Sequence, residues 1–468
     1  MTDISQLSAA DLLRLYRRRE LSPVEVARDA FDRIARFEPQ INAFVLTDED
    51  GALEAARASE ARWAKGEPMG LADGLPATIK DIVDIKGKPT RKGSLTTPDK
   101  PATDDAPAVA RLKEQGAVLL GKTTTPEFGW IGACHSPLTG ITRNPWNLTR
   151  TTGGSSGGAA AAALLNLGVL HLGTDGAGSV RIPSAFTGTF GIKPSYGRVP
   201  AYPASAFTVL AHQGPLTRTV TDAALMLSVI GQPDMRDTTA WNTPAPDFRI
   251  GLNDGVRGLR IAWSPRLGYV KELDADVEAA AYKAAQVFAD LGAHVEEVDP
   301  GFAEPIEMEK KLWYAVASTI VDAVPPAEQA KMDEGLRRMA DEGRRVSLID
   351  HLAAHGQRTE LALHMLRFHE RYDLLLTPQM PVPAIEAGRV TPADGRFGDE
   401  WINWSPYTYP FNLTQQPAAS VPCGFATDGL PVALQIVGPP RQDQLVLRAA
   451  RAFESACPFA TLAAPRAA

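Results

Sequence analysis

Two glycine-rich segments present serine hydroxyls with little side-chain cover around them. The first, residues 152–158, reads Thr-Gly-Gly-Ser-Ser-Gly-Gly and contains Ser155 and Ser156; the second, residues 172–183, contains Ser179. A single loop of this kind is often a flexible connection or a phosphate cradle at the start of a helix. However, no Gly-Lys-Ser/Thr follows the first segment, and the second does not fit GxGxxG. The pair of loops therefore favours chemistry at a serine.

A serine hydroxyl becomes a good nucleophile only when a base removes its proton. The histidines do not fall into a GxSxG-linked arrangement, and neither His171 nor His212 carries the signature of a catalytic triad. Lys80 follows an apolar run at residues 75–79. Burial there would lower the pKa of its amine and leave it partly neutral, so Lys80 is the candidate base.

These residues resemble the amidase signature enzymes. That family has GGSSGG, an alanine-rich helix and then GTDxGGSxRxPAxxxGxxGxKP. The corresponding positions here are residues 153–158, residues 173–183, Ser184, Gly188, Gly191, Lys193 and Pro194. Shorter matches lie at residues 76–81, 214–219, 376–378 and 420–424, so the resemblance spans about residues 8–457.

The resemblance implies a mechanism with three side chains. Ser179 would be the nucleophile, Ser155 a bridging serine on a cis peptide bond, and Lys80 the base. Lys80 would take the proton of Ser155 while Ser155 takes that of Ser179, which attacks the amide carbonyl. The relay then protonates the leaving amine, and water hydrolyses the acyl-enzyme. The implied reaction converts a small-molecule carboxylic amide to an acid and an amine or ammonia, with no cofactor and no metal.

An oxyanion formed in this reaction needs backbone N–H donors placed in advance. The resemblance assigns oxyanion and substrate binding to the two loops, through Gly154, Ser156, Gly176, Ala177, Gly178 and Ser179. This chain departs from the family at Ala177, where glycine is usual. A Cβ fits there only if φ stays negative or if strain is tolerated.

The substrate pocket distinguishes the members of the family. The resemblance places Ser405 where the glutaminase subunits of tRNA-dependent amidotransferases carry an aspartate for the glutamine amino group. Residues 401–411 are rich in aromatic side chains, which suit an apolar or aryl amide, although ordinary core packing also explains them. The pocket candidates are Phe128, Trp404, Tyr407, Asp175 and Arg181. For Asp175 and Arg181 we favour a role in orienting the loop; Arg181 could instead bind an acidic substrate.

We therefore expect a stand-alone amidase, and the alternative is the glutaminase subunit of a tRNA-dependent amidotransferase. A metal-dependent amidohydrolase is a rival from another class, because His351 and His355 are four residues apart and His364 and His369 follow. No glutamate accompanies that spacing, so these histidines fit one face of a solvated helix. A non-catalytic binding protein would require that Ala177 has spoiled the oxyanion hole.

Composition narrows the partners and the compartment. The 468 residues include 48 basic and 55 acidic side chains, and a net charge of -7 disfavours binding to nucleic acid. Three cysteines far apart suit a reducing compartment. Charges interrupt residues 1–20, and the longest apolar run, residues 159–172, is too short to span a membrane. We expect a cytoplasmic protein without a membrane segment.

The alternation of elements predicts an α/β sheet. The family resemblance implies the rest of the fold: one α/β/α domain, with a large mixed twisted sheet and helices on both faces. Residues 1–65 form a helical region with capping boxes at Ser8 and Ser22, which is also the candidate contact in a homodimer. Residues 70–230 form the signature core and residues 259–468 the second half of the sheet. Predicted strands cover residues 77–85, 117–121, 259–263, 294–298, 373–377 and 432–437; predicted helices cover 106–115 and 275–291, and 232–258 is a surface loop.

Overall fold

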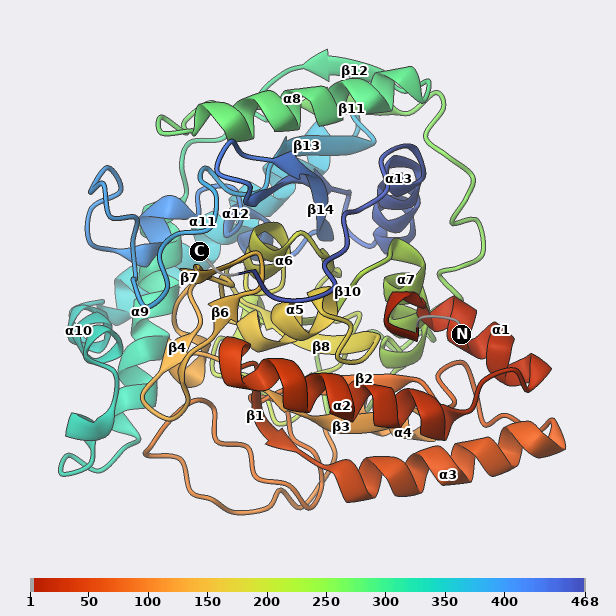
Figure 1. The fold of residues 1–468 in the computed structure, drawn as a ribbon. Helices are drawn as coiled ribbons and strands as arrows, with labels where there is room; N and C mark the ends of the chain where they lie inside the picture. Colours follow the sequence, from red (N-terminus) through yellow and green to blue (C-terminus); the bar gives the residue numbers. More distant parts are fainter. Residues whose placement is uncertain (1–3, 467–468) are drawn as a thin grey trace.

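A single mixed sheet of eleven strands runs through the molecule (Figure 1). The computed structural model describes residues 4–466 and orders the strands β1-β3-β2-β8-β10-β9-β14-β15-β13-β11-β12. β2 and β11 each run parallel to both of their neighbours, whereas the strands in the middle of the sheet pair antiparallel. The predicted mixed α/β fold is therefore confirmed. The strands are β1 (Phe44–Thr47), β2 (Pro76–Lys80), β3 (Val118–Thr123), β8 (Leu170–Asp175), β9 (Phe190–Lys193), β10 (His212–Thr217), β11 (Arg260–Trp263), β12 (His294–Glu297), β13 (Leu374–Pro378), β14 (Ala418–Phe425) and β15 (Pro431–Val437). Two small ribbons are formed by β4 (His135–Ser136) with β5 (Gly140–Ile141) and by β6 (Arg143–Asn144) with β7 (Asn147–Thr151).

Helices cover both faces of this sheet. One core cluster joins it to α1, α4, α7, α8 and α13, and another contains apolar residues of α2, α5, α6, α9 and α10. The helices are α1 (Ala9–Arg18), α2 (Pro23–Ile41), α3 (Glu49–Lys65), α4 (Pro107–Glu114), α5 (Gly157–Leu164), α6 (Arg181–Thr187), α7 (Val220–Ile230), α8 (Ala275–Asp290), α9 (Ile306–Asp322), α10 (Glu334–Gly343), α11 (Leu348–Phe368), α12 (Pro410–Leu413) and α13 (Asp443–Ala456). None of the helices formed by residues 4–466 combines the length and the apolar character needed to cross a bilayer.

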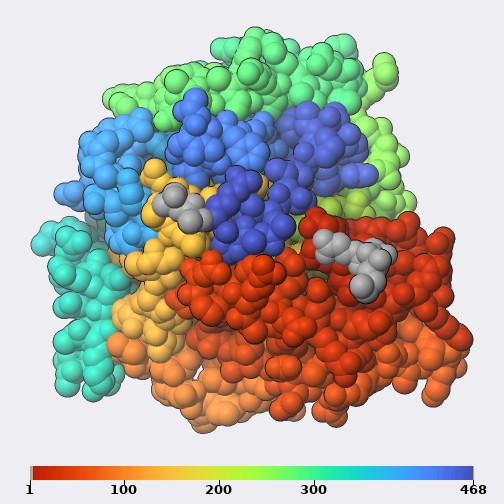
Figure 2. All heavy atoms as spheres, viewed as in Figure 1, coloured from red at the N-terminus to blue at the C-terminus, as the bar shows by residue number. Residues whose placement is uncertain are grey.

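The first two helices begin as their sequences predict. Ser8 and Ser22 each form a complete capping box, with Asp11 and Glu25 as the reciprocal partners. Figure 2 shows the C-terminal segment lying directly beside these N-terminal helices, and Leu462 joins the same core cluster as α2. A homodimer through the N-terminal helices stays a prediction.

The strand that carries Lys80 is shorter than its sequence predicts. It ends at Lys80 and not at residue 85, because the N–H groups of Ile82 and Val83 both turn back to the Lys80 carbonyl, at 2.7 and 3.0 Å. The next residue, Asp81, forms a buried ion pair of 2.8 Å with Lys122 of β3. Lys80 therefore lies at the carboxyl end of its strand.

The composition of the glycine-rich segment from residue 172 predicts a turn throughout, but the structure shows that its first part is a strand. Leu170–Asp175 is a strand, β8, which lies between β2 and β10. Gly173 belongs there because α5 comes very close: a Cβ on Gly173 would lie 2.8 Å from Ser156 Oγ. Since β2 and β8 are parallel, their carboxyl ends meet at one edge of the sheet. The second serine loop leaves from that edge, and the first leads into α5 above it.

Residues 232–258 contain no helix or strand, as predicted, and connect α7 to β11 between the two halves of the sheet. The chain in this segment is still anchored, because Phe248, Leu252 and Val256 are buried.

Two helical glycines allow a matched test of the close packing under α5. A Cβ on Gly158 would lie 2.4 Å from both the Ala43 carbonyl oxygen and Thr124 Oγ1, whereas a Cβ on Gly356 in α11 meets nothing within 4 Å. We expect Gly158→Ala to lower the free energy of unfolding by about 1–3 kcal/mol through overpacking. Gly356→Ala should raise it by up to about 1 kcal/mol, because alanine favours the helix. Urea unfolding measures the change in the free energy of unfolding for both variants. Changes of the same sign in Gly158→Ala and Gly356→Ala would contradict the close packing at Gly158.

Candidate active site

Hydroxyl groups surround the amine of Lys80 at the end of β2. Its Nζ donates to Ser155 Oγ at 2.6 Å, to Ser156 Oγ at 3.0 Å and to Thr174 Oγ1 at 2.8 Å. The lysine is fully buried, and this burial lowers its pKa to about 7. A large share of the molecules therefore carries a neutral amine at neutral pH, as the predicted base requires.

Ser155 lies between this amine and the cavity that holds Ser179. The peptide bond from Gly154 to Ser155 is cis. A Cβ on Gly129 would lie only 3.1 Å from Ser155 Oγ, so glycine leaves the room that this hydroxyl occupies. The Ser156 N–H donates to the Ser179 carbonyl at 3.1 Å, which joins the two serine loops.

The Ser179 hydroxyl opens into the cavity. Among residues 4–466 it makes no hydrogen bond, and the predicted contact with Ser155 Oγ is not formed, although both serines line one cavity. Contacts of this kind are often long in free enzymes and tighten in the complex with substrate. The structure thus contains the Lys80–Ser155 part of the expected relay and places Ser179 beside it.

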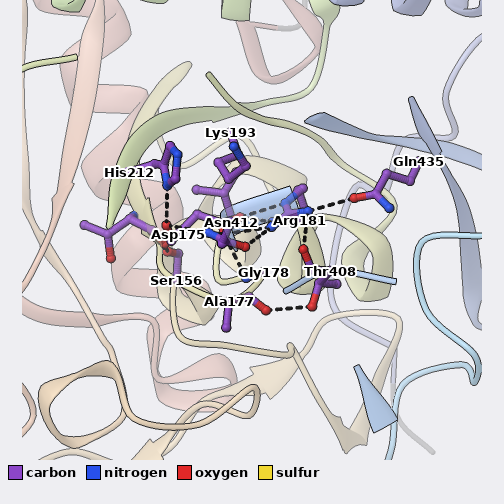
Figure 3. Close-up of polar contacts among 12 residues, drawn as sticks. Ser156, Asp175, Ala177, Gly178, Arg181, Lys193, His212, Thr408, Asn412 and Gln435 are labelled. Atoms are coloured by element: carbon purple, nitrogen blue, oxygen red, sulfur yellow. Dashed lines mark hydrogen bonds and ion pairs between the residues drawn. The ribbon is translucent and has the colours of Figure 1, made fainter. Parts of the chain in front are cut away.

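Asp175 determines which backbone N–H groups of the second loop remain for a substrate. Its carboxylate accepts from the N–H groups of Gly178 at 2.8 Å and Val180 at 3.1 Å (Figure 3). Within residues 4–466, the N–H groups of Gly176, Ala177 and Ser179 form no hydrogen bond. Of the four predicted oxyanion donors, Gly178 thus has its N–H bound to Asp175, whereas the other three are unbonded within the described residues.

Arg181 holds that carboxylate from the opposite side. Both side chains are completely buried, and Arg181 Nε and Nη2 donate to Asp175 at 3.0 Å each. The guanidinium also donates to Gln435 Oε1, Asn412 Oδ1 and the Thr408 carbonyl (Figure 3). Burial acts to raise the pKa of Asp175, but the Arg181 charge outweighs it and holds this pKa well below its usual range. Because its N–H groups bind protein atoms and it does not line the cavity, Arg181 orients the loop.

Ala177 fits the loop although the family usually has glycine there. It is not among the residues with positive φ, so its Cβ imposes no left-handed strain. Its carbonyl accepts from Thr408 Oγ1 at 2.6 Å, and the residue is fully buried. The departure from the family pattern therefore leaves the turn intact.

A cavity of 490 Å³ lies in front of the two serines. Phe128 lines it as predicted, with a left-handed φ of 51° that is uncommon for a residue other than glycine. Most of the other large side chains that line it are apolar, namely Ile82, Val83, Phe207, Trp313 and Ile320. Phe207 stacks on Trp313 with ring centroids 4.0 Å apart. This composition suits an apolar acyl or aryl group.

The aromatic stretch at residues 401–411 does not line this cavity, which corrects the pocket prediction for Trp404 and Tyr407. Trp404 is fully buried and stacks on Phe186, and the Tyr407 hydroxyl donates to the Pro265 carbonyl. Ser405 is also buried and donates to the Ile402 carbonyl. Ordinary core packing therefore accounts for this stretch.

The histidines have other partners. His351 and His355 contact each other at 3.2 Å on α11, while His364 and His369 reach backbone carbonyls. In the described part of the chain, no group of three metal-binding side chains lies together. His212 does line the cavity, but its Nδ1 is held by the carbonyls of Leu210 and Asp175.

Two polar residues beside the relay escaped the sequence analysis. Thr174 lies within the matched GTD segment, yet nothing in the pattern indicated that its hydroxyl contacts Lys80. Gln213 directly precedes the landmark that begins at Gly214, and it lines the cavity. The register of β8 with β10 places these two residues opposite each other, which could be found only from the fold.

Known proteins resemble this chain over nearly its whole length. The family model described as Amidase matches residues 25–447. An acylamidase from Rhodococcus erythropolis is 36% identical over 97% of this chain and 96% of its own. A glutamyl-tRNA(Gln) amidotransferase subunit from Myxococcus xanthus is 37% identical over 99% of each chain.

Solved structures agree with these relatives. A bacterial aryl acylamidase of the amidase signature family superimposes with a TM-score of 0.90 at 33% identity, covering 97% of both chains. The buried lysine, the paired serine loops and these matches lead to one conclusion: the chain belongs to the amidase signature family and is a hydrolase of amide C–N bonds.

Proposed function

We propose that this enzyme is a stand-alone amidase that cleaves apolar or aryl amides through an acyl-enzyme on Ser179. The observation that carries the proposal is the 2.6 Å contact between Lys80 Nζ and Ser155 Oγ, with the amine fully buried and Ser179 in the same cavity. A neutral amine in this position is able to accept a proton that passes through Ser155.

The proposed reaction uses only groups of this chain. As the Ser179 oxygen bonds to the amide carbon, its proton passes to Ser155, and the Ser155 proton passes to Lys80. The unbonded N–H groups of Gly176, Ala177 and Ser179 are the candidate donors to the carbonyl oxygen as it gains negative charge. The relay then runs in reverse and protonates the nitrogen as the C–N bond breaks. Water releases the acid from Ser179 by the same route.

The apolar lining of the cavity supports the choice of substrate. Phe128, Phe207 and Trp313 offer aromatic surface, and one of the similar solved structures is described as an aryl acylamidase. An aryl ring buried against such side chains gains about 25 cal/mol for each Å² of apolar surface removed from water.

A glutaminase subunit is the second candidate, because the amidotransferase relative from Myxococcus xanthus matches this chain as well as the acylamidase does. The apolar lining of the cavity, with Phe128, Phe207 and Trp313, favours the stand-alone enzyme. Initial rates with L-glutamine and with an N-aryl acetamide distinguish the two. A higher kcat/KM for glutamine would overturn our choice.

The nucleophile can be identified with one substitution and one label. We expect Ser179→Ala to reduce turnover of an N-aryl acetamide by at least about 1,000-fold, since the attacking oxygen is lost. The melting temperature should not fall, because the Ser179 hydroxyl makes no hydrogen bond among the described residues. A fluorophosphonate should label Ser179 in the parent enzyme. Ser205→Ala, which changes another serine of the cavity, should leave both turnover and labelling in place. Labelling at a different residue would contradict the assignment.

The protonation of Lys80 predicts the direction of the pH dependence. Because burial lowers its pKa to about 7 and the neutral amine is the base, kcat/KM should fall as the pH drops below about 7 and level off above it. Lys80→Ala should lower kcat/KM by about 100- to 10,000-fold and remove this inflection. Lys92→Met, at a second lysine of the cavity, should keep the inflection where it is. An unchanged profile in Lys80→Ala would exclude Lys80 as the base.

A further inference from the structure

The side-chain oxygen of Gln213 is buried beside the cavity without a partner among residues 4–466. Gln213 is 8% exposed and lines the space in front of Ser155 and Ser179. Its Oε1 is fully enclosed and accepts no hydrogen bond from the described part of the chain. A buried acceptor of this kind is uncommon, because leaving it unmet costs about 1–3 kcal/mol.

The register of the sheet places this amide beside the proton relay. Gln213 on β10 is directly opposite Thr174 on the antiparallel strand β8, so the two side chains leave the same face with Cβ atoms about 5 Å apart. Thr174 Oγ1 is in turn 2.8 Å from Lys80 Nζ. Gln213 is therefore one side chain away from Lys80, the proposed base at the end of the relay.

Polar side chains that line the cavity, such as Lys92 and Tyr202, form no hydrogen bond with Gln213 Oε1. The large side chains there are mainly apolar, and the Thr319 hydroxyl donates to the Val316 carbonyl within its own helix. The neighbouring residue, His212, contacts two backbone carbonyls, those of Leu210 and Asp175, through its Nδ1. A donor for Gln213 Oε1 is thus most readily supplied by the molecule that fills the cavity.

We propose that Gln213 Oε1 accepts the N–H of the scissile amide and thereby makes the enzyme selective for amides over esters. The inference rests on the proposed function. When Ser179 attacks a secondary amide, the nitrogen becomes tetrahedral and keeps its own hydrogen while its lone pair must face Ser155. An N–H bonded to Gln213 fixes that orientation. The Ser179 O–C bond forms, the C–N bond breaks, and the amine leaves with its original hydrogen and the relayed proton. The oxygen of an ester has no hydrogen to offer.

The proposed role of Gln213 can be tested with an amide and an ester that differ only in the leaving atom. 4-Nitroacetanilide and 4-nitrophenyl acetate share the acyl and aryl groups and differ only in NH against O. In Gln213→Met, which keeps the length of the side chain but removes its acceptor, we expect kcat/KM for the anilide to fall about 10- to 100-fold. The ester should change less than about twofold, since it never used the amide oxygen. The amide-to-ester ratio is a readout that a general loss of structure would not move.

Controls separate the possible outcomes. Thr97→Val, which removes another polar group that lines the cavity, should leave the ratio unchanged. An equal fall for both substrates in Gln213→Met, or no fall for either, would overturn the role of Gln213 while leaving the amidase proposal in place. A parent enzyme that cleaves neither substrate would overturn both. Thermal melting of each variant confirms that the compared proteins are folded.

Discussion

The proposed chemistry of this enzyme depends on keeping the Lys80 amine buried without a carboxylate as its direct partner. Lys80 donates only to hydroxyl groups, so nothing beside it holds the proton as an ion pair would. The contrast with Lys122 is instructive: that lysine is equally buried and is paired with Asp81 at 2.8 Å. Burial lowers the pKa of both amines, but only Lys80 has hydroxyl groups as its sole hydrogen-bond partners and can act as a base toward them.

The fold satisfies this constraint with small residues and one fixed ion pair. The N-terminal end of α5 packs so closely that Gly157, against Cys134, and Gly158, against Ala43 and Thr124, have no room for a Cβ. The same approach brings Ser155 and Ser156 over Lys80. On the other side, the Asp175–Arg181 pair draws the Gly178 and Val180 N–H groups inward. The N–H group of Ser179, which lies between them, is left unbonded within the described chain. One buried carboxylate therefore both shapes the second loop and selects its donors.

The sequence predicted those features that depend on particular residue types within a short segment of the chain. The glycine-walled serines and a lysine after an apolar run could be singled out from the residues themselves, whereas the separate roles of Ser155 and Ser179 came from the family resemblance. The caps at Ser8 and Ser22 could be predicted because each is set within four residues. The sheet, with its mixed order and helices on both faces, followed from the alternation of elements and the family resemblance. The substrate cavity did not follow. Phe207 and Trp313 are far apart in sequence and meet only in the fold, while Trp404 and Tyr407, which looked like pocket residues, fill the core. Composition alone does not tell a pocket aromatic from a core aromatic, because both are apolar and large.

The apolar cavity and the lysine base reinforce each other. An apolar group that fills the space beside Phe128 and Trp313 would displace water from the cavity next to Ser155 and lower the dielectric near the buried Lys80, which further disfavours the charged form of this amine. Binding a substrate of this kind therefore makes the base more available at the moment when it is needed. A charged substrate would bring the opposite effect, since a nearby anion stabilises the ammonium. Under the proposed mechanism, the lining of the cavity would act on the rate through the pKa of Lys80 as well as on selection through shape, and uncharged amides would be the best matched substrates.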